Sequence, residues 1–248
     1  MRAEDYELLY GLEESYWWFV GMRAIADAVI TQRRNGERLR TLDAGCGTGF
    51  NLTYYESGGN HDLYGLDIAA EAVDGVRKRG FQKLAQASVT DIPFQSGAFD
   101  LVFSFDVVCQ VPVDAIEQAI REMHRVLKPG GFLFIRVPAL EWLRSSHDEE
   151  LHTFHRFTRE ELARHLEDAG FQVGWSSYAN TLLFPVAVLR RLLKHIGIGR
   201  GTDVRPLPAG LAWLDSIFRT LLLQEAKIFK SGKRLPIGLS VICYAMKK

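Results

Sequence analysis

The residues of this chain with the clearest potential for chemistry form a glycine-rich turn near residue 45. The segment 41–51 reads TLDAGCGTGFN, in which a short apolar stretch leads into glycines at every second position. Glycine allows the backbone to turn sharply and to lie against a ligand where a Cβ would clash. The spacing of Gly45, Gly47 and Gly49 differs from the G-x-G-x-x-G of dinucleotide sites, because the third glycine comes one position early. Asp43 precedes the turn, and its carboxylate favours a ligand that carries positive charge over a pyrophosphate.

Further acidic residues follow the strand-like segments downstream. Asp67 ends the apolar segment 62–68 and comes 18 positions after Gly49, close to the spacing at which an acid binds a ribose diol. Asp91 and Asp106 stand at or just past the ends of two later strand-like segments. Ligands of open α/β sheets bind at the carboxyl ends of the strands, so four acids at this edge indicate one binding site.

The elements that must position these acids alternate between strand and helix. The pattern predicts a parallel, doubly wound sheet with right-handed crossovers. Strand four, residues 99–106, is almost continuously apolar, as expected for a strand that is buried on both faces. The predicted strands are 39–44, 62–68, 83–89, 99–106, 132–138, 171–178 and 239–246, and the helices between them include 70–79, 114–127 and 158–169.

The motif D-x-G-x-G-x-G after a strand resembles the first motif of class I S-adenosylmethionine (SAM) dependent methyltransferases of the type 11/12-like group. The Leu-Lys-Pro-Gly-Gly segment at 127–131, before strand five, is similar to a second family feature. The resemblance implies a Rossmann-like, seven-stranded, mostly parallel sheet with helices on both faces, in which the last strand runs antiparallel beside strand five. It also implies SAM as cofactor and S-adenosylhomocysteine as product. The cofactor-binding residues that it implies are Asp43, Gly45, Cys46, Gly47, Gly49, Asp67, Ile68, Asp91, Ile92, Phe105 and Asp106.

An aromatic run precedes this core. Four consecutive aromatic residues occupy 16–19, and Arg23 follows them within a helical segment. The run resembles the tryptophan-rich leader of some bacterial methyltransferases, which implies a lid with Tyr16 or Arg23 near the methionine carboxylate. A helix that only packs its aromatic rings on the domain is the alternative. We therefore divide the chain into a helical cap (1–38), a SAM-binding core (39–179), a helical insertion (180–236) and a last core strand (237–248).

Candidate catalytic bases lie near strand five and strand six. His147 and His155 belong to a histidine-rich loop over the ligand edge, and Tyr178 ends strand six. Histidine can accept a proton near neutral pH, although each residue could instead be part of a solvated loop or, for His155, hold the lid in register. Many family members carry Glu-His where this chain has Cys109 and Gln110, which removes one common base. The histidine spacing lacks a diagnostic zinc pattern, so we predict no metal.

The composition bounds the class of protein. The chain has 248 residues, 47% of them hydrophobic, with 30 basic and 30 acidic side chains, which suits one α/β domain with additions and argues against nucleic-acid binding. Its three cysteines have no metal or disulfide spacing, which fits a reducing compartment. We see no signal peptide and no stretch of about 20 apolar residues, so we expect a cytoplasmic location. We expect the chain to be a monomer or a homodimer.

The insertion 180–236 departs from this neutrality, with ten basic and three acidic residues. A helical subdomain that covers the sheet or forms a dimer contact is one interpretation. The other is a basic and apolar surface for a membrane face or an anionic, lipid-linked substrate.

Taken with the resemblance, these patterns predict a methyltransferase that acts by in-line methyl transfer on a small-molecule, glycan or secondary-metabolite acceptor in a biosynthetic role. One alternative is methylation of a lipid-linked or membrane-associated substrate. Others are an NAD(P)-dependent oxidoreductase or epimerase, against which Phe50 in place of the third dinucleotide glycine counts, and a non-catalytic partner subunit with a SAM fold.

Overall fold

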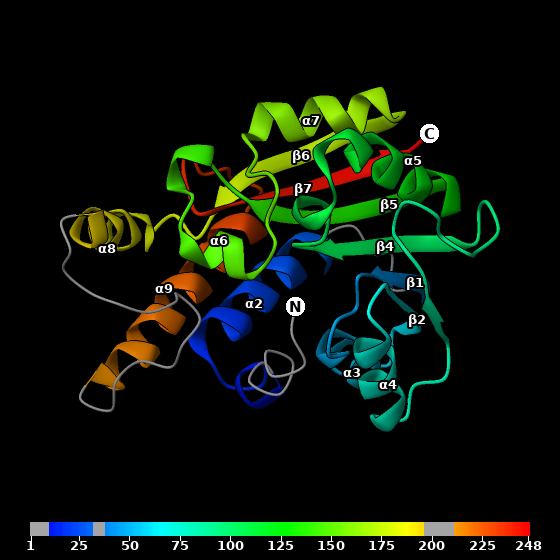
Figure 1. Ribbon diagram of the computed structural model, residues 1–248, viewed down its shortest axis with the longest axis horizontal. Helices are drawn as coiled ribbons and strands as arrows, with labels where there is room; N and C mark the ends of the chain where they lie inside the picture. The colour runs from blue at the N-terminus through cyan, green and yellow to red at the C-terminus, as the bar shows by residue number, and fades with distance from the viewer. Residues whose placement is uncertain (1–9, 32–37, 196–210) are drawn as a thin grey trace.

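The structure is a computed structural model that describes residues 10–31, 38–195 and 211–248, the side chains at 147 and 192–195 excepted. These residues form a seven-stranded sheet in the order β3-β2-β1-β4-β5-β7-β6 (Figure 1). The strands are β1 (Leu39–Ala44), β2 (His61–Asp67), β3 (Leu84–Gln86), β4 (Phe99–Phe105), β5 (Leu127–Pro138), β6 (Phe171–Ala179) and β7 (Ser240–Lys247).

The pairing of the strands brings the predicted site residues to one edge. β1 runs parallel to β2 and β4, with Asp43 opposite Gly65 and Phe103. β7 runs antiparallel to both of its neighbours, with Ser240 opposite Pro138 of β5 and Ala179 of β6. The mostly parallel sheet and the place of the last strand are therefore confirmed. The end of β5, the end of β6 and the start of β7 all lie at the same edge as the glycine turn.

Helices cover both faces of this sheet. α5 and α7 pack on one face, and α2, α3 and α9 pack on the other (Figure 1). In α5 the buried residues recur at helical spacing along one stripe, which fixes the face turned to the sheet. The helices are α2 (Trp17–Ile30), α3 (Phe50–Ser57), α4 (Ala70–Lys78), α5 (Ile116–Val126), α6 (Ser146–Glu150), α7 (Arg159–Asp168), α8 (Phe184–His195) and α9 (Trp213–Lys230).

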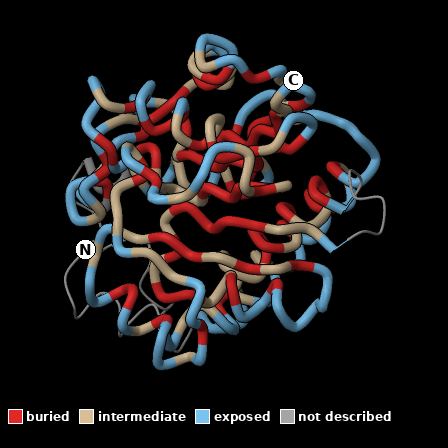
Figure 2. The backbone as a smooth tube through the Cα atoms, turned by 90° about the vertical axis from the view of Figure 1, so that its right-hand side faces the viewer, coloured by how far each residue is buried: buried red, intermediate tan, exposed pale blue. Residues whose placement is uncertain are grey.

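The side chains of β5 show how the two layers of the core are built. Phe132 and Phe134 point to the face covered by α2 and α9, whereas Leu133 and Ile135 point to the face covered by α5 and α7. This is the two-residue alternation of a strand that is buried on both sides. Figure 2 shows the buried residues gathered in the central strands and on the helix surfaces that face them.

The insertion contributes directly to this core. α9 packs along α2 although nearly 200 residues separate them in sequence, and a Cβ on Gly21 of α2 would lie 2.4 Å from Leu222 of α9. For α9, the insertion is therefore a helical part that covers the sheet, which is one of the two interpretations given above. Residues 196–210 of the insertion lie outside the described residues, and its contact with a membrane stays a prediction. Within the described ranges, no helix is both long and apolar enough to cross a membrane.

Several predicted boundaries differ from the structure. The helix expected over 114–127 begins as a 3-10 turn at Val113–Ala115 and continues as α5 to Val126. Leu127 already belongs to β5 and pairs with Phe99. The strand pairing is irregular between Phe99 and Leu101, so that β5 includes the turn at Gly130 (φ 79°). Strand three is also shorter than expected.

Candidate functional site

The glycine turn between β1 and α3 has the conformation that its sequence demands. Gly45, Gly47 and Gly49 have φ angles of 95°, 51° and 77°, a region that residues with a Cβ rarely adopt. A Cβ on Gly45 would lie 2.2 Å from Val107, and a Cβ on Gly49 would lie 2.7 Å from Val76. A Cβ on Gly47 would meet nothing within 4 Å, so at this residue the backbone borders open space. Gly47 is therefore where a ligand can approach the turn.

Asp43 lies directly before the turn and is an unusual buried acid. Its side chain is 1% exposed, and neither carboxylate oxygen has a hydrogen-bond partner among the described residues. Burial raises the pKa of Asp43 well above its usual value, and the nearby carboxylate of Asp67 raises this pKa further. A buried carboxyl group without a partner is costly. A positively charged ligand at this edge would offset part of that cost.

Asp67 at the end of β2 ties this acid cluster to the glycine turn. Its Oδ2 accepts a hydrogen bond from the Gly47 N–H at 2.8 Å, and its Oδ1 accepts one from the Ala69 N–H at 3.0 Å. A carboxylate has about four acceptor positions, so two remain for a ligand. The next residue, Ile68, is 70% exposed and presents an apolar surface beside the acid.

Asp106, at the end of β4, forms an ion pair with Arg136 of β5. The Arg136 Nε and Nη2 both donate to the Asp106 Oδ2, at 2.9 and 2.6 Å. The guanidinium lies between two aromatic rings, 4.8 Å from the ring centre of Trp18 and 5.2 Å from that of Phe105. Asp106 has a left-handed backbone (φ 58°), and its carbonyl oxygen accepts hydrogen bonds from Cys109 and Gln110. The two residues that replace Glu-His therefore hold this turn.

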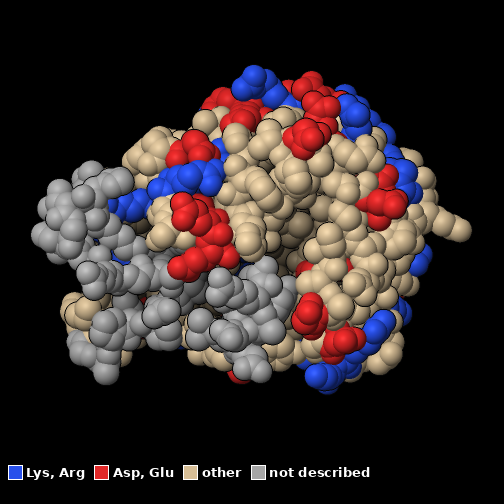
Figure 3. All heavy atoms as spheres, viewed as in Figure 1, with Lys and Arg blue, Asp and Glu red and all other residues tan. Residues whose placement is uncertain are grey.

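A cavity of about 780 Å³ opens at this edge, between the glycine turn, the end of β5 and the helices α2, α6 and α8. On the face drawn in Figure 3 the surface is hollowed, and acidic and basic side chains both lie near the hollow. Of the residues predicted to bind the cofactor, those that line the cavity are Tyr16, Arg23, Gly45, Cys46, Gly47, Phe105 and Asp106. Asp43 and Asp67 lie beside the cavity, under and against the turn.

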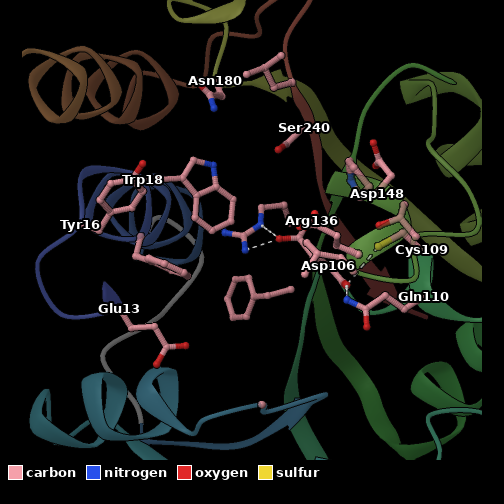
Figure 4. Close-up of a pocket in the computed structure, with 18 of the residues that line it drawn as sticks. Glu13, Tyr16, Trp18, Asp106, Cys109, Gln110, Arg136, Asp148, Asn180 and Ser240 are labelled. Carbon is pink, nitrogen blue, oxygen red and sulfur yellow. Dashed lines mark hydrogen bonds and ion pairs between the residues drawn. The ribbon is translucent and has the colours of Figure 1, made fainter. Parts of the chain in front are cut away.

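The start of α2 and the segment before it line one side of the cavity, where the aromatic run was predicted to act as a lid. Tyr16 and Trp18 line it, as Figure 4 shows, together with Arg23. The guanidinium of Arg23 lies 4.5 Å from the centre of the Phe50 ring, and burial lowers the pKa of Arg23. Glu13 accepts a hydrogen bond from the Thr48 hydroxyl in the glycine turn, and burial raises the pKa of Glu13. This end of the chain is thus joined to the turn itself.

Asp91 and Ile92 lie farther along the same edge, after β3. Neither is among the residues that line the cavity. Asp91 is exposed, whereas Ile92 is 2% exposed and its N–H donates to Glu122 of α5.

The predicted bases His155 and Tyr178 contact the start of α7 and do not line the cavity. The His155 Nε2 lies 2.7 Å from Glu161, and the Tyr178 hydroxyl accepts a hydrogen bond from the Arg159 N–H at 3.2 Å. Both side chains therefore support the start of α7, where Thr158 and Glu161 form the predicted capping box. Neither lines the cavity, and the side chain of His147 lies outside the described residues. His152, which lies in the same histidine-rich loop but is not among the predicted bases, does line it.

Several cavity residues had no role in the sequence analysis. Arg136 could have been found as the one charged residue in the apolar segment 132–137. Asn180 and Ser240 carry no such signal, since they are ordinary polar residues at strand ends. The metal prediction stays untested, although within the described ranges no group of three or more His, Cys, Asp or Glu side chains could hold a metal ion.

The sheet order with its antiparallel seventh strand, the D-x-G-x-G-x-G turn after β1 and the acid at the end of β2 together define the class I SAM-dependent methyltransferase fold. Comparison with known proteins supports this class. Residues 42–135 match the methyltransferase domain family.

Named relatives agree with this assignment. The chain is 31% identical over 147 residues to the malonyl-[acyl-carrier protein] O-methyltransferase of Enterobacter lignolyticus, which covers 56% of this chain and 57% of that protein. It is 28% identical over 217 residues to the protein of the same name from Pseudescherichia vulneris, with 81% and 84% covered. A chain from the complex between the Haloferax volcanii Trm112 methyltransferase activator and a methyltransferase superposes with a TM-score of 0.63 at 19% identity, covering 98% and 95%. The chain spans little more than half the length of the first of these relatives.

Proposed function

We propose that this chain binds SAM along the carboxyl edge of β1, β2 and β4 and transfers its methyl group to a small-molecule acceptor in the cavity. The observation that carries the proposal is Asp43, a buried acid without a partner among the described residues, next to the open backbone of Gly47. SAM carries an ammonium and a sulfonium, so its positive charge fits this cluster of acids. When bound, SAM supplies an activated methyl group and leaves as S-adenosylhomocysteine.

Each predicted binding residue then has a defined part. Asp67 binds the ribose diol with the acceptor positions that its backbone hydrogen bonds leave free. Ile68, with Asp91 and Ile92 farther along the edge, borders the adenine. Asp43 and Asp106 face the charged groups of the methionine half, and Tyr16 and Arg23 of the lid lie toward its carboxylate.

The chemistry asks little of the protein beyond alignment. Methyl transfer requires the acceptor atom in line with the sulfur–methyl bond and water excluded from the site. Trp18, packed over Arg136, and the other aromatic residues of the lid supply that exclusion. An acceptor that must lose a proton can pass it to His152 at the cavity wall or to solvent. His155, His147 and Tyr178 remain candidates by prediction, although His155 and Tyr178 are placed to support α7.

The acceptor is the finer part of the proposal. A cavity of about 780 Å³ suits a small molecule beside a cofactor. The names of the relatives suggest a malonyl thioester as the first acceptor to try, followed by hydroxylated metabolites and glycans. Transfer of a labelled methyl group from SAM to any of these would identify the acceptor class.

Calorimetric titration with S-adenosylhomocysteine, with NADH as a control, tests the cofactor. We expect micromolar binding of S-adenosylhomocysteine and none of NADH. Binding of NADH alone would overturn the proposal in favour of an oxidoreductase. Binding of S-adenosylhomocysteine without transfer to any acceptor would instead indicate a non-catalytic SAM-fold subunit.

A further inference from the structure

One wall of the cavity is built from residues at or next to the ends of β5, β6 and β7. Arg136 and Ser240 lie on the sheet face covered by α2 and α9, because Ser240 is opposite Pro138, two residues beyond Arg136. Ser240 also pairs with Ala179 of β6, and Asn180 is the next residue. Figure 4 shows Asn180 and Ser240 toward the top of the view, with Trp18 and Arg136 below them.

Asn180 is the unusual member of this wall. Its side chain lines the cavity and is 1% exposed, yet its Oδ1 has no hydrogen-bond partner among the described residues. Its backbone is left-handed, with a φ of 59°. Asp106, His152 and Asn180, three of the four described non-glycine residues with positive φ, line the cavity. Such strain gathers at functional sites, where the surrounding structure holds it.

The surrounding structure does hold this residue. Glu225 of α9, which is fully buried, accepts hydrogen bonds from the Asn180 N–H at 2.7 Å and the Leu182 N–H at 2.6 Å. A buried carboxylate that anchors two backbone N–H groups fixes the turn between β6 and α8. The position of the Asn180 side chain is therefore set by α9, even though its own amide oxygen is left unpaired.

The missing partner of Asn180 is a hydrogen-bond donor. The Oδ1 can only accept, whereas the Ser240 hydroxyl, which also lies at this end of the sheet, can donate or accept. A hydroxyl group on a ligand can donate to the Asn180 Oδ1 and accept from the Ser240 hydroxyl. A carboxylate or an ether can only accept and would leave the Oδ1 unpaired, which costs binding free energy.

The charges around the cavity favour a neutral ligand as well. Five acidic and five basic side chains line it, and two of the pairs, Arg136 with Asp106 and Arg156 with Asp148, neutralise each other directly. The cavity wall also includes aromatic and aliphatic side chains, with Trp17, Phe218 and Leu183 among them. Such a wall suits an apolar ligand body.

We propose that Asn180 and Ser240 form the acceptor subsite and select a neutral acceptor with a free hydroxyl on an apolar body, and that Glu225 is the positioning residue for Asn180. The inference rests on the proposed methyltransferase function, because it assigns the acceptor for that site. The site distinguishes a ligand with a free hydroxyl from an analogue without one, because only the hydroxyl can donate to the Asn180 oxygen.

The test uses three naphthalene probes that differ in one group: 2-naphthol, 2-methoxynaphthalene and 2-naphthoate. Their binding to the full chain saturated with S-adenosylhomocysteine is measured by ligand-observed NMR titration. We expect 2-naphthol to bind about tenfold more tightly than either analogue. In Asn180→Gly, which keeps the left-handed backbone without strain, this preference should vanish while the affinity for S-adenosylhomocysteine is unchanged. Asn60→Gly, directly before β2, is the control and should keep the preference.

A second variant tests the positioning residue. Glu225→Gln can accept from one of the two N–H groups only, so the preference for 2-naphthol should fall without loss of S-adenosylhomocysteine binding. The proposal is overturned if the wild type binds all three probes equally, prefers 2-naphthoate or binds none of them. It is also overturned if the preference survives Asn180→Gly. Failure of S-adenosylhomocysteine to bind the wild type would instead overturn the proposed function.

Discussion

Asp67 shows how one side chain can serve both the backbone and a ligand. Its two oxygens accept from the N–H groups of Gly47 and Ala69, so the acid fixes the shape of the glycine turn before any ligand arrives. We expect Asp67→Ala to weaken the binding of S-adenosylhomocysteine by about 2 kcal/mol, roughly 30-fold, because both the turn and the ribose lose a partner. Calorimetry gives this difference directly.

The control for Asp67 lies on the same strand. Asp62 pairs with Lys83 at the exposed edge of the sheet, where an ion pair contributes little to stability. Asp62→Ala should leave the affinity unchanged. An equal affinity in Asp67→Ala would mean that Asp67 does not bind the ribose.

At the scale of elements, the start of α2 is attached at two places. Glu13 accepts from Thr48 in the glycine turn, whereas the Trp17 N–H donates to Asp215 of α9 at 3.2 Å. We expect Thr48→Val, which removes the hydroxyl, to increase the dissociation rate of S-adenosylhomocysteine about fivefold, because one neutral-to-charged hydrogen bond is worth about 1 kcal/mol or more. Stopped-flow displacement measures this rate.

A nearby threonine provides the comparison for Thr48. Thr53 lies on α3, and its hydroxyl donates to the carbonyl oxygen of Gly49. Thr53→Val should leave the dissociation rate close to that of the wild type. If Thr48→Val also left it unchanged, the attachment of Glu13 would not control the lid.

The elements that the sequence predicted are those set by local patterns. The glycine turn follows from residues within 41–51, and the sheet order follows from alternating strands and helices with fixed crossover handedness. The last strand was placed by the family resemblance and is confirmed beside β5.

What the sequence did not predict depends on contacts between distant segments. Glu225 holds Asn180 across 45 residues, and the Trp18 ring covers Arg136 from a different element. Periodicity can say that α9 has an apolar face, but it cannot say which helix or loop that face meets. The histidine-rich loop similarly drew attention to His155, but the His155 ring forms a hydrogen bond with Glu161 at the start of α7.

For the molecule as a whole, acidic and basic residues are equal in number, yet acids are buried at the ligand edge. Burial raises the pKa of Asp43, Glu13 and Glu225, so the folded chain keeps protons that the unfolded chain releases. Where the folded state binds more protons, stability falls as the pH rises. For Asp43 this window begins near its unfolded value of about 3.8 and extends upward to the raised pKa of the folded state.

Asp43→Asn isolates this contribution, because it keeps the shape of the side chain and removes its titration. We expect the variant and the wild type to differ little in free energy of unfolding near pH 4. The variant should become more stable than the wild type by on the order of 1 kcal/mol or more toward neutral pH. At that pH the unfolded chain ionises Asp43 freely, whereas the folded wild type must either keep this carboxyl group protonated or bury its charge, and both cost free energy. Urea unfolding at a series of pH values measures both curves.

Binding of S-adenosylhomocysteine to the same variant separates stability from function. If Asp43 is kept for a positively charged ligand, the more stable Asp43→Asn should bind SAM less tightly than the wild type does, and S-adenosylhomocysteine, which lacks the sulfonium charge, should lose less affinity than SAM. A variant whose stability advantage is the same at pH 4 and pH 7 would show that Asp43 does not titrate in this window. A variant that binds both ligands as the wild type does would show that the acid is not part of the cofactor site.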